Sequence, residues 1–80
     1  MKLTVKLFAT LQKYAPDGEK AGQPFQVTLP EGSTVGDLMD ELEIPREAFH
    51  IAYVDGRACR EDFELQPGTE VGLFPPVGGG

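Results

Sequence analysis

Apolar and polar residues alternate along several short segments of the chain, a period of two that is typical of strands with one buried face. Leu3, Val5 and Leu7 are separated in this way by Thr4 and Lys6. Similar alternation, or a short apolar run bounded by turn residues, recurs further along the chain. The predicted strands are residues 3–7, 25–29, 51–54 and 71–74, with a short return segment at 57–61.

In the middle of the chain the apolar period changes from two to three or four, which predicts a helix. Its buried stripe consists of Val35, Leu38, Met39 and Leu42. Thr34 precedes Asp37 by three residues, so the two side chains resemble a capping box at the first turn. Pro45 is expected to end this helix at residue 43 or 44. A shorter helix is expected over residues 9–14.

One helix and a small set of strands can bury both apolar surfaces only if the helix packs across one face of the sheet. The sequence therefore predicts an α+β fold, a mixed sheet covered by one main helix. The first and last strands can lie side by side in the middle, as in a β-grasp (ubiquitin-like) roll, although spacing alone does not decide the topology. Asp55-Gly56 is a favourable tight turn after the third strand. We expect one β-grasp domain over residues 1–74 and an extended, flexible tail over residues 75–80.

The composition changes abruptly after Phe74, where two prolines are followed by Val77 and three glycines. Proline holds the backbone extended and cannot donate to a sheet, whereas glycine leaves the backbone slim and free. Residues 75–80 would reach roughly 20 Å at ~3.1–3.5 Å per residue. Such a tip can enter an ATP site as a carboxylate and become an acyl adenylate, so we expect an acyl or sulfur carrier. The alternative is a frayed end or an expression remnant.

Thirteen acidic and seven basic side chains give the chain a formal net charge of −6. This balance argues against binding to a phosphate backbone and suits a partner with a basic docking surface. No apolar run is long enough to span a bilayer, and residues 1–8 alternate where a signal peptide would be continuously apolar. The lone Cys59 excludes an internal disulfide and a thiolate metal cluster. We expect a cytoplasmic protein that binds neither nucleic acid nor membrane.

Five segments of the chain match motifs of a known family. They are Leu7-Phe8-Ala9-Thr10-Leu11, Gly32-Ser33-Thr34-Val35-Gly36-Asp37-Leu38, Val54-Asp55-Gly56, Leu65 through Val71, and Phe74-Pro75-Pro76-Val77-Gly78-Gly79-Gly80. Together they resemble the MoaD/ThiS family of ubiquitin-like sulfur carriers, and most closely its molybdopterin synthase small subunits. The last segment is the most specific of the five, and the resemblance covers nearly the whole chain.

The resemblance implies a role in molybdenum cofactor biosynthesis. An adenylating enzyme (MoeB-like) would use Mg-ATP to activate the carboxylate of Gly80, and a sulfur donor such as a cysteine desulfurase or rhodanese would convert it to a thiocarboxylate. The molybdopterin synthase large subunit (MoaE-like) would then receive the tail, and the sulfur would pass to cyclic pyranopterin monophosphate. The chain is thus expected to be the sulfur-donating subunit of a sulfurtransferase complex and not an enzyme alone.

The site residues expected from the tail and its surroundings fall into two groups. Gly80 is the reacting residue. The expected partner-binding residues are Phe8, Phe74, Pro75, Pro76, Val77, Gly78 and Gly79. Phe8 and Phe74 form an apolar docking patch in one interpretation and complete the core in the other. We expect no metal site and no cofactor bound by this chain itself.

Other polar residues are interpreted as structural. His50 has no neighbour with ligand spacing and is expected at the surface, and Cys59 is expected to be a half-buried thiol. The acidic group of the helix and its surroundings is expected to be a solvated face, with docking as the lesser alternative; its members are Asp37, Asp40, Glu41, Glu43 and Glu47. Three positions depart from the family pattern, one of which is Asp55, which replaces a frequent Asn in a turn that tolerates either. Gln12 stands where many members have Arg, and Glu43 stands where Gly often ends the helix.

Three other functions fit parts of the pattern. A ubiquitin-like protein modifier would join its tail to a lysine of a target protein. A sulfur carrier for another pathway, such as that of the thiamin thiazole, would use the same thiocarboxylate. A plain interaction module would have an inert tail.

Overall fold

The computed structural model describes residues 1–16, 20 and 22–76. The expected site residues Val77, Gly78, Gly79 and Gly80 lie outside the described residues. The elements are β1 (Lys2–Leu7), the 3₁₀ helix η1 (Ala9–Tyr14), β2 (Phe25–Thr28), α1 (Val35–Glu41), the 3₁₀ turn η2 (Arg46–Ala48), β3 (Ile51–Val54), β4 (Arg57–Cys59) and β5 (Glu70–Phe74).

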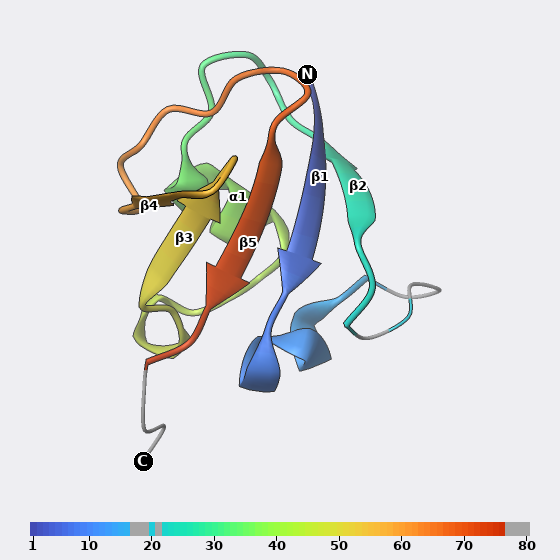
Figure 1. Ribbon diagram of the computed structural model, residues 1–80, viewed down its shortest axis with the longest axis vertical. Coiled ribbons are helices and arrows are strands. Elements are labelled where there is room, and N and C mark those ends of the chain that lie inside the picture. The colour runs from blue at the N-terminus through green and yellow to red at the C-terminus, as the bar shows by residue number, and fades with distance from the viewer. Residues whose placement is uncertain (17–19, 21, 77–80) are drawn as a thin grey trace.

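The strands form one mixed sheet with the order β2-β1-β5-β3-β4. The first and last strands, β1 and β5, run parallel in the centre, with Thr4 opposite Glu70 and Leu7 opposite Leu73. Every other neighbouring pair is antiparallel. Helix α1 lies across one face of the sheet, as Figure 1 shows. This arrangement confirms the predicted β-grasp roll.

The core lies between α1 and the face of the sheet that it covers. The alternating residues of β1 and β5 point into it, since Leu3, Val5, Leu7, Val71 and Leu73 are at most 1% exposed. The predicted helical stripe completes it: Val35, Leu38, Met39 and Leu42 are all buried. Among the described residues, no buried side-chain nitrogen or oxygen lacks a hydrogen-bond partner.

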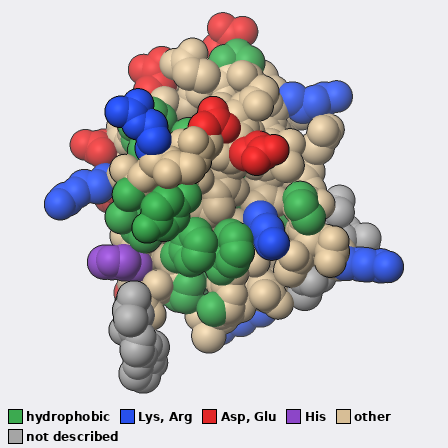
Figure 2. Space-filling view, in the orientation of Figure 1, with side chains coloured by type: hydrophobic (Ala, Val, Ile, Leu, Met, Phe, Trp, Pro, Cys, Tyr) green, Lys and Arg blue, Asp and Glu red, His purple; other side chains and the backbone are tan. Residues whose placement is uncertain are grey.

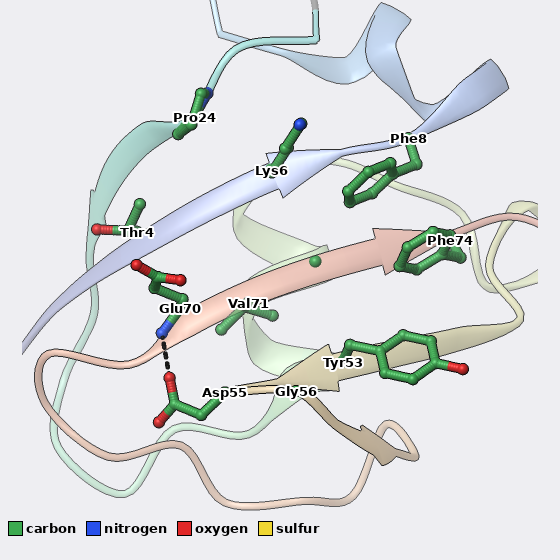
Figure 3. A pocket seen from close by; sticks show the side chains of 11 residues that line it. Thr4, Lys6, Phe8, Pro24, Tyr53, Asp55, Gly56, Glu70, Val71 and Phe74 are labelled. Atoms are coloured by element: carbon green, nitrogen blue, oxygen red, sulfur yellow. Dashed lines mark hydrogen bonds between the residues drawn. The ribbon is translucent and has the colours of Figure 1, made fainter.

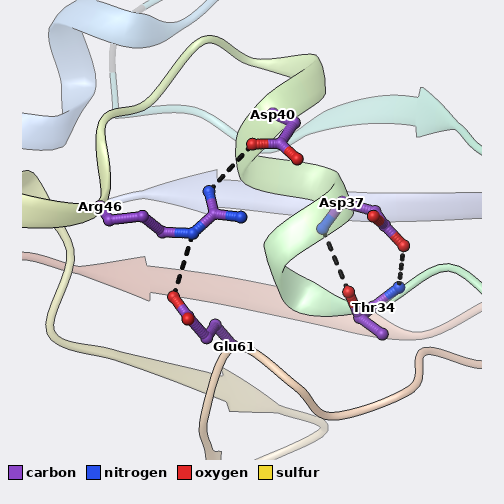
Figure 4. A network of polar contacts seen from close by, with 5 residues as sticks. All are labelled: Thr34, Asp37, Asp40, Arg46 and Glu61. Atoms are coloured by element: carbon purple, nitrogen blue, oxygen red, sulfur yellow. Dashed lines mark hydrogen bonds and ion pairs between the residues drawn. The ribbon is translucent and has the colours of Figure 1, made fainter.

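The start of α1 carries the predicted capping box (Figure 4). The backbone N–H of Asp37 donates to the Thr34 hydroxyl at 3.2 Å, and the N–H of Thr34 donates to the Asp37 carboxylate at 2.9 Å. The two bonds satisfy donors that the first turn of a helix leaves without intrahelical partners. Asp therefore replaces the more usual Glu of this motif without loss of either bond.

The end of α1 differs from the sequence-based expectation. The helix ends at Glu41, two or three residues earlier than predicted, because Glu43 adopts a left-handed conformation with φ 59°. The N–H of Ile44 then donates to the carbonyl of Met39 at 2.9 Å, and that of Glu43 to Asp40 at 3.1 Å. This pair of bonds is a Schellman motif, with Glu43 in the position that glycine usually occupies.

The hairpin between β3 and β4 has the predicted turn. Asp55 and Gly56 have φ values of 49° and 85°, as a type I′ turn requires. The return strand is shorter than the predicted 57–61, because the chain leaves the sheet after Cys59 to meet the start of α1. There the N–H of Gly36 donates to the carbonyl of Glu61 at 2.8 Å. The Gly36 N–H, which has no partner within the first turn of the helix, is thus satisfied by the segment that follows the shortened strand.

Candidate partner-binding face and tail

The sheet face opposite α1 is open, and apolar side chains gather on it above the point where the tail begins (Figures 1 and 2). Its central position is Gly72 of β5, which lies opposite Lys6 of β1 on one side and Tyr53 of β3 on the other. Phe8 extends the β1 ladder beyond its last strand residue, because its N–H donates to the carbonyl of Leu73 at 3.1 Å. The register therefore brings side chains from both ends of the chain onto one surface.

Three aromatic rings form a cluster at the carboxyl end of β5 (Figure 3). The rings of Phe8 and Phe74 are stacked, with centroids 4.1 Å apart and planes at 8°. Tyr53 meets Phe74 edge-on at 5.3 Å and is 43% exposed. Phe8 and Phe74 are half-buried and lie outside the core. The structure therefore brings the two predicted phenylalanines together on the open face, which fits the docking interpretation better than the core interpretation.

Tyr53 is a member of this cluster that the sequence-based prediction omits. The signal was present in the 51–54 segment, where Ala52 and Val54 are buried and Tyr53 between them is exposed. In a strand with one buried face, the intervening residue points to the opposite face. Which aromatic neighbours Tyr53 meets there depends on the pairing of β3 with β5, and the local pattern does not contain that pairing.

The other end of the open face is acidic. The Asp55 carboxylate accepts a hydrogen bond from the backbone N–H of Glu70 at 3.0 Å, so the hairpin turn is joined to the start of β5 (Figure 3). Lys6 belongs to the aromatic end, since its Nζ lies 5.0 Å from the centroid of the Phe8 ring. The open face thus runs from aromatic rings to carboxylates along β5.

The predicted tail leaves the sheet directly beside the aromatic cluster. The last bond of the sheet on this side runs from the N–H of His50 to the carbonyl of Phe74 at 2.9 Å. Pro75 is half-buried and Pro76 is exposed, and neither belongs to a helix or strand. His50 is exposed just before β3, as predicted.

The acidic group around α1 is exposed throughout, as predicted for a solvated face. Within it, Arg46 bridges Asp40 of α1 and Glu61 of the loop after β4, at 3.0 and 3.1 Å (Figure 4). The pKa of the Arg46 guanidinium is raised, mainly by the hydrogen bond that it donates to Asp40. Because these groups are exposed, the bridge holds η2 to the helix with little effect on stability.

The remaining candidate residues are structural. Cys59 is 8% exposed, somewhat more buried than expected, and its Sγ lies 3.4 Å from the carbonyl of Arg57. Gln12 is half-buried on η1. Within the part of the chain that the structure describes, no group of three or more His, Cys, Asp or Glu side chains could hold a metal ion. No helix among the same residues is long and apolar enough to cross a membrane.

The model of the ThiS family matches residues 5–80 of the chain. The match includes the tail and the whole sheet apart from the first residues of β1. The chain belongs to the ThiS family of ubiquitin-like sulfur carriers. A search of curated protein sequences gives no significant match. The predicted family is therefore confirmed by the family model and by the solved structures described next.

The fold of this ThiS-family protein is shared with solved archaeal structures. A Pyrococcus furiosus protein assigned as molybdopterin converting factor, subunit 1, is 32% identical, covers 95% of this chain and 98% of its own, and superposes with a TM-score of 0.72. Small archaeal modifier protein 1 of Haloferax volcanii is 28% identical over 95% of this chain and 98% of its own, with a TM-score of 0.72. A further crystal structure of SAMP1 from Haloferax volcanii is 26% identical, covers 100% of both chains and gives 0.71.

Proposed function

We propose that this ThiS-family protein is the sulfur-carrying small subunit of a molybdopterin synthase, with the carboxylate of Gly80 as its reacting group. The main support is that a partly exposed aromatic cluster, Phe8, Tyr53 and Phe74, is followed in the chain directly by Pro75-Pro76 and the glycine end. In this proposal, the docking surface lies beside the start of the reactive arm. The chain is similar to a Pyrococcus furiosus protein that is assigned as a molybdopterin converting factor, and this similarity favours the molybdopterin pathway.

The chemistry begins at the partner enzyme. A Gly80 carboxylate oxygen attacks the α-phosphorus of Mg-ATP held by a MoeB-like adenylating enzyme, and pyrophosphate leaves. Sulfide, or a persulfide of a desulfurase or rhodanese, then attacks the acyl carbon and AMP leaves. When the nucleophile is a persulfide, a further thiol cleaves the resulting S–S bond and leaves the thiocarboxylate on Gly80. The tail is thereby charged with one sulfur atom.

The charged tail then serves a MoaE-like large subunit. The thiocarboxylate sulfur attacks a carbon of cyclic pyranopterin monophosphate bound there and displaces an oxygen from that carbon. Hydrolysis of the acyl–sulfur bond then restores the Gly80 carboxylate and leaves the sulfur on the product. Pro75 and Pro76 stiffen the arm, so little conformational entropy is lost when it docks. Val77, Gly78 and Gly79 occupy the partner's narrow channel, where side chains on the two glycines would collide. The reaction takes place in the cytoplasm, where Cys59 stays reduced.

The aromatic cluster supplies the docking energy in this scheme. Phe8 and Phe74 present stacked faces, and Tyr53 adds a large exposed ring. Aromatic side chains are enriched among the residues that dominate binding energy at protein interfaces. Both partners, the adenylating enzyme and the large subunit, are proposed to use this cluster, because the tail that both need begins beside it.

Intact-mass analysis after co-expression with the adenylating enzyme tests the proposal. With ATP and a sulfur donor present, one oxygen of the chain should be replaced by sulfur, and fragmentation should place the change at Gly80. Deleting Gly80 should abolish the change and leave the melting temperature unaltered, because residue 80 is outside the folded sheet in this scheme. Omitting ATP is the matched control. An unmodified full-length chain under complete conditions would contradict the proposal.

The likeness to small archaeal modifier protein 1 favours a second candidate function, conjugation to other proteins. In that case the Gly80 adenylate would be attacked by a lysine amine of a target. Proteolytic digests of the same co-expression should then contain lysines carrying a glycine-terminated remnant. Supply of sulfur for the thiamin thiazole is distinguished by assaying thiazole formation against conversion of cyclic pyranopterin monophosphate.

A further inference from the structure

The open face has a hollow at its centre, beside Gly72. Gly72 lies between Lys6 and Tyr53 in the rows of the sheet, with Phe74 and Glu70 two residues away along β5. The hollow has a volume of about 300 Å³, and Gly72 and Gly56 are among the residues that line it (Figure 3). A glycine inside a strand often marks a place where another group approaches the backbone closely.

A side chain at position 72 would disturb the walls of this hollow. A Cβ built on Gly72 would lie 3.0 Å from Cε2 of Phe8 and 3.5 Å from Cε1 of Phe74. Gly72 therefore allows the Phe8 ring to reach across the sheet and stack on Phe74. The floor of the hollow is backbone, and its walls at one end are aromatic, so it favours the apolar part of whatever enters.

The opposite end of the hollow carries negative charge without a counter-ion. Asp55 and Glu70 line that end, and no described cation lies within ion-pair distance of either carboxylate. One Asp55 oxygen is held by the Glu70 N–H, which fixes the carboxylate at the rim. Lys6 is turned to the aromatic end, over Phe8, and leaves the acidic end unopposed. A complementary occupant is apolar along its length and positive at its tip.

We propose that the Gly72 hollow receives one arginine side chain from a protein partner, with the aliphatic stem against the aromatic rings beside Gly72 and the guanidinium at Glu70 and Asp55. Arginine fits better than lysine because its planar head forms paired hydrogen bonds with carboxylates. The net charge of −6 favours approach of such a basic surface. That the partner is the large subunit or the adenylating enzyme rests on the proposed function; the binding of arginine does not.

The test is a titration of the ¹⁵N-labelled full chain with N-acetyl-arginine amide, followed by amide chemical shifts. N-acetyl-norleucine amide is the matched probe without charge. Saturable shifts are expected at Gly72, Tyr53 and Glu70 with the arginine probe, and weaker binding with norleucine. Equal binding of the two probes, or shifts located elsewhere, would overturn the proposal, because the hollow would then lack selectivity for a cation.

Two variants locate the contact. Glu70→Gln removes one carboxylate without changing the backbone bond to Asp55, and should weaken arginine binding about fivefold, as for one exposed ion pair. Gly72→Ala places a Cβ against the Phe8 ring, which forces the aromatic wall of the hollow to shift, and should weaken binding about tenfold or more, as at an interface hot spot. Glu41→Gln, which makes the same charge change on α1, should have no effect. If the two variants, Glu70→Gln and Glu41→Gln, lost arginine affinity equally, the binding would reflect only general charge attraction, and the proposal would be overturned.

The titration needs neither ATP nor the tail. Its failure would leave the thiocarboxylate proposal standing, to be decided by the mass of Gly80. Conversely, an uncharged tail under complete conditions would not affect the titration. If the arginine site holds, Glu70→Gln should also weaken the complex with the large subunit, and unaltered affinity there would overturn the assignment of the hollow to that partner.

Discussion

The two faces of the sheet are built from alternate residues of the same strands, yet they meet different demands. On the closed face, Val5, Val71 and Leu73 are almost completely buried beneath α1. On the open face, the alternate positions of β5 are Glu70, Gly72 and Phe74, none of which is fully buried. The closed face is therefore optimised for packing, and the open face keeps a charge, a gap and a partly exposed ring.

This difference separates stability from recognition. Buried apolar area is the main favourable term in folding, so the closed face supplies most of the free energy of unfolding. The open face contributes less to that energy because its rings stay partly in water. A small domain in which a helix covers only one face of the sheet can leave the other face free for partners. Substitutions on the two faces should therefore separate into two classes.

The largest effect is expected on the closed face. Leu73→Ala removes a side chain that is 0% exposed between the central strands and α1. Loss of buried methyl groups together with the cavity left behind should lower the free energy of unfolding by about 2–5 kcal/mol. Urea denaturation measures this loss. Tyr53→Ala, on the open face, is the control and should cost much less; equal losses would contradict the division between the faces.

The next largest effect is expected in binding. Phe74→Ala removes the ring that contacts both Phe8 and Tyr53, so affinity for the adenylating enzyme should fall at least about tenfold, as at an interface hot spot. The free energy of unfolding should fall by about 2 kcal/mol, since two aromatic pairs and some half-buried apolar area are lost. Phe63→Ala is the control, since Phe63 is exposed but does not line the hollow. Calorimetric titration compares the two variants, and similar affinities would remove the aromatic cluster from the docking surface.

The closed face was the more predictable of the two. Its residues follow local rules: a period of two in β1 and β5, a period near four in α1, and a capping box formed by Thr34 and Asp37. These signals need only neighbours in the chain. Because each apolar stripe had to be buried, the covering of the sheet by α1 followed from the pattern as well.

The open face was predicted in part. Phe8 and Phe74 were expected either to form a docking patch or to complete the core, and their stacking depends on the parallel pairing of β1 with β5 and on Gly72 between the rows. Tyr53 and the acidic end join them only through the antiparallel pairing of β3 with β5. Such long-range registers are not written in local periodicity. The expected roles of Val77 to Gly80 remain predictions, since they rest on the family resemblance.

The smallest effect tests the helix that closes the packed face. Glu43 holds a left-handed conformation (φ 59°), which costs a residue with a Cβ roughly 1 kcal/mol relative to glycine. Glu43→Gly should relieve this strain while retaining the bonds of Ile44 and residue 43 to α1, because both use backbone atoms. The greater freedom of glycine in the unfolded chain offsets part of the gain. We therefore expect a net stabilisation of about 0.5 kcal/mol, or a rise of a few degrees in the melting temperature.

A second glycine variant makes this prediction specific. Glu41→Gly places glycine at the last residue of α1, which is still helical, and should destabilise the helix by up to about 1 kcal/mol. The two substitutions remove the same charged side chain two residues apart, so opposite signs can only come from backbone conformation. Thermal unfolding of both variants gives the comparison. Because Glu43 follows α1, on the closed side of the sheet, the Glu43→Gly substitution should leave arginine binding at the Gly72 hollow unchanged. If Glu43→Gly destabilised the fold, the left-handed end of α1 would have to be held by the Glu43 side chain and not by the Schellman bonds.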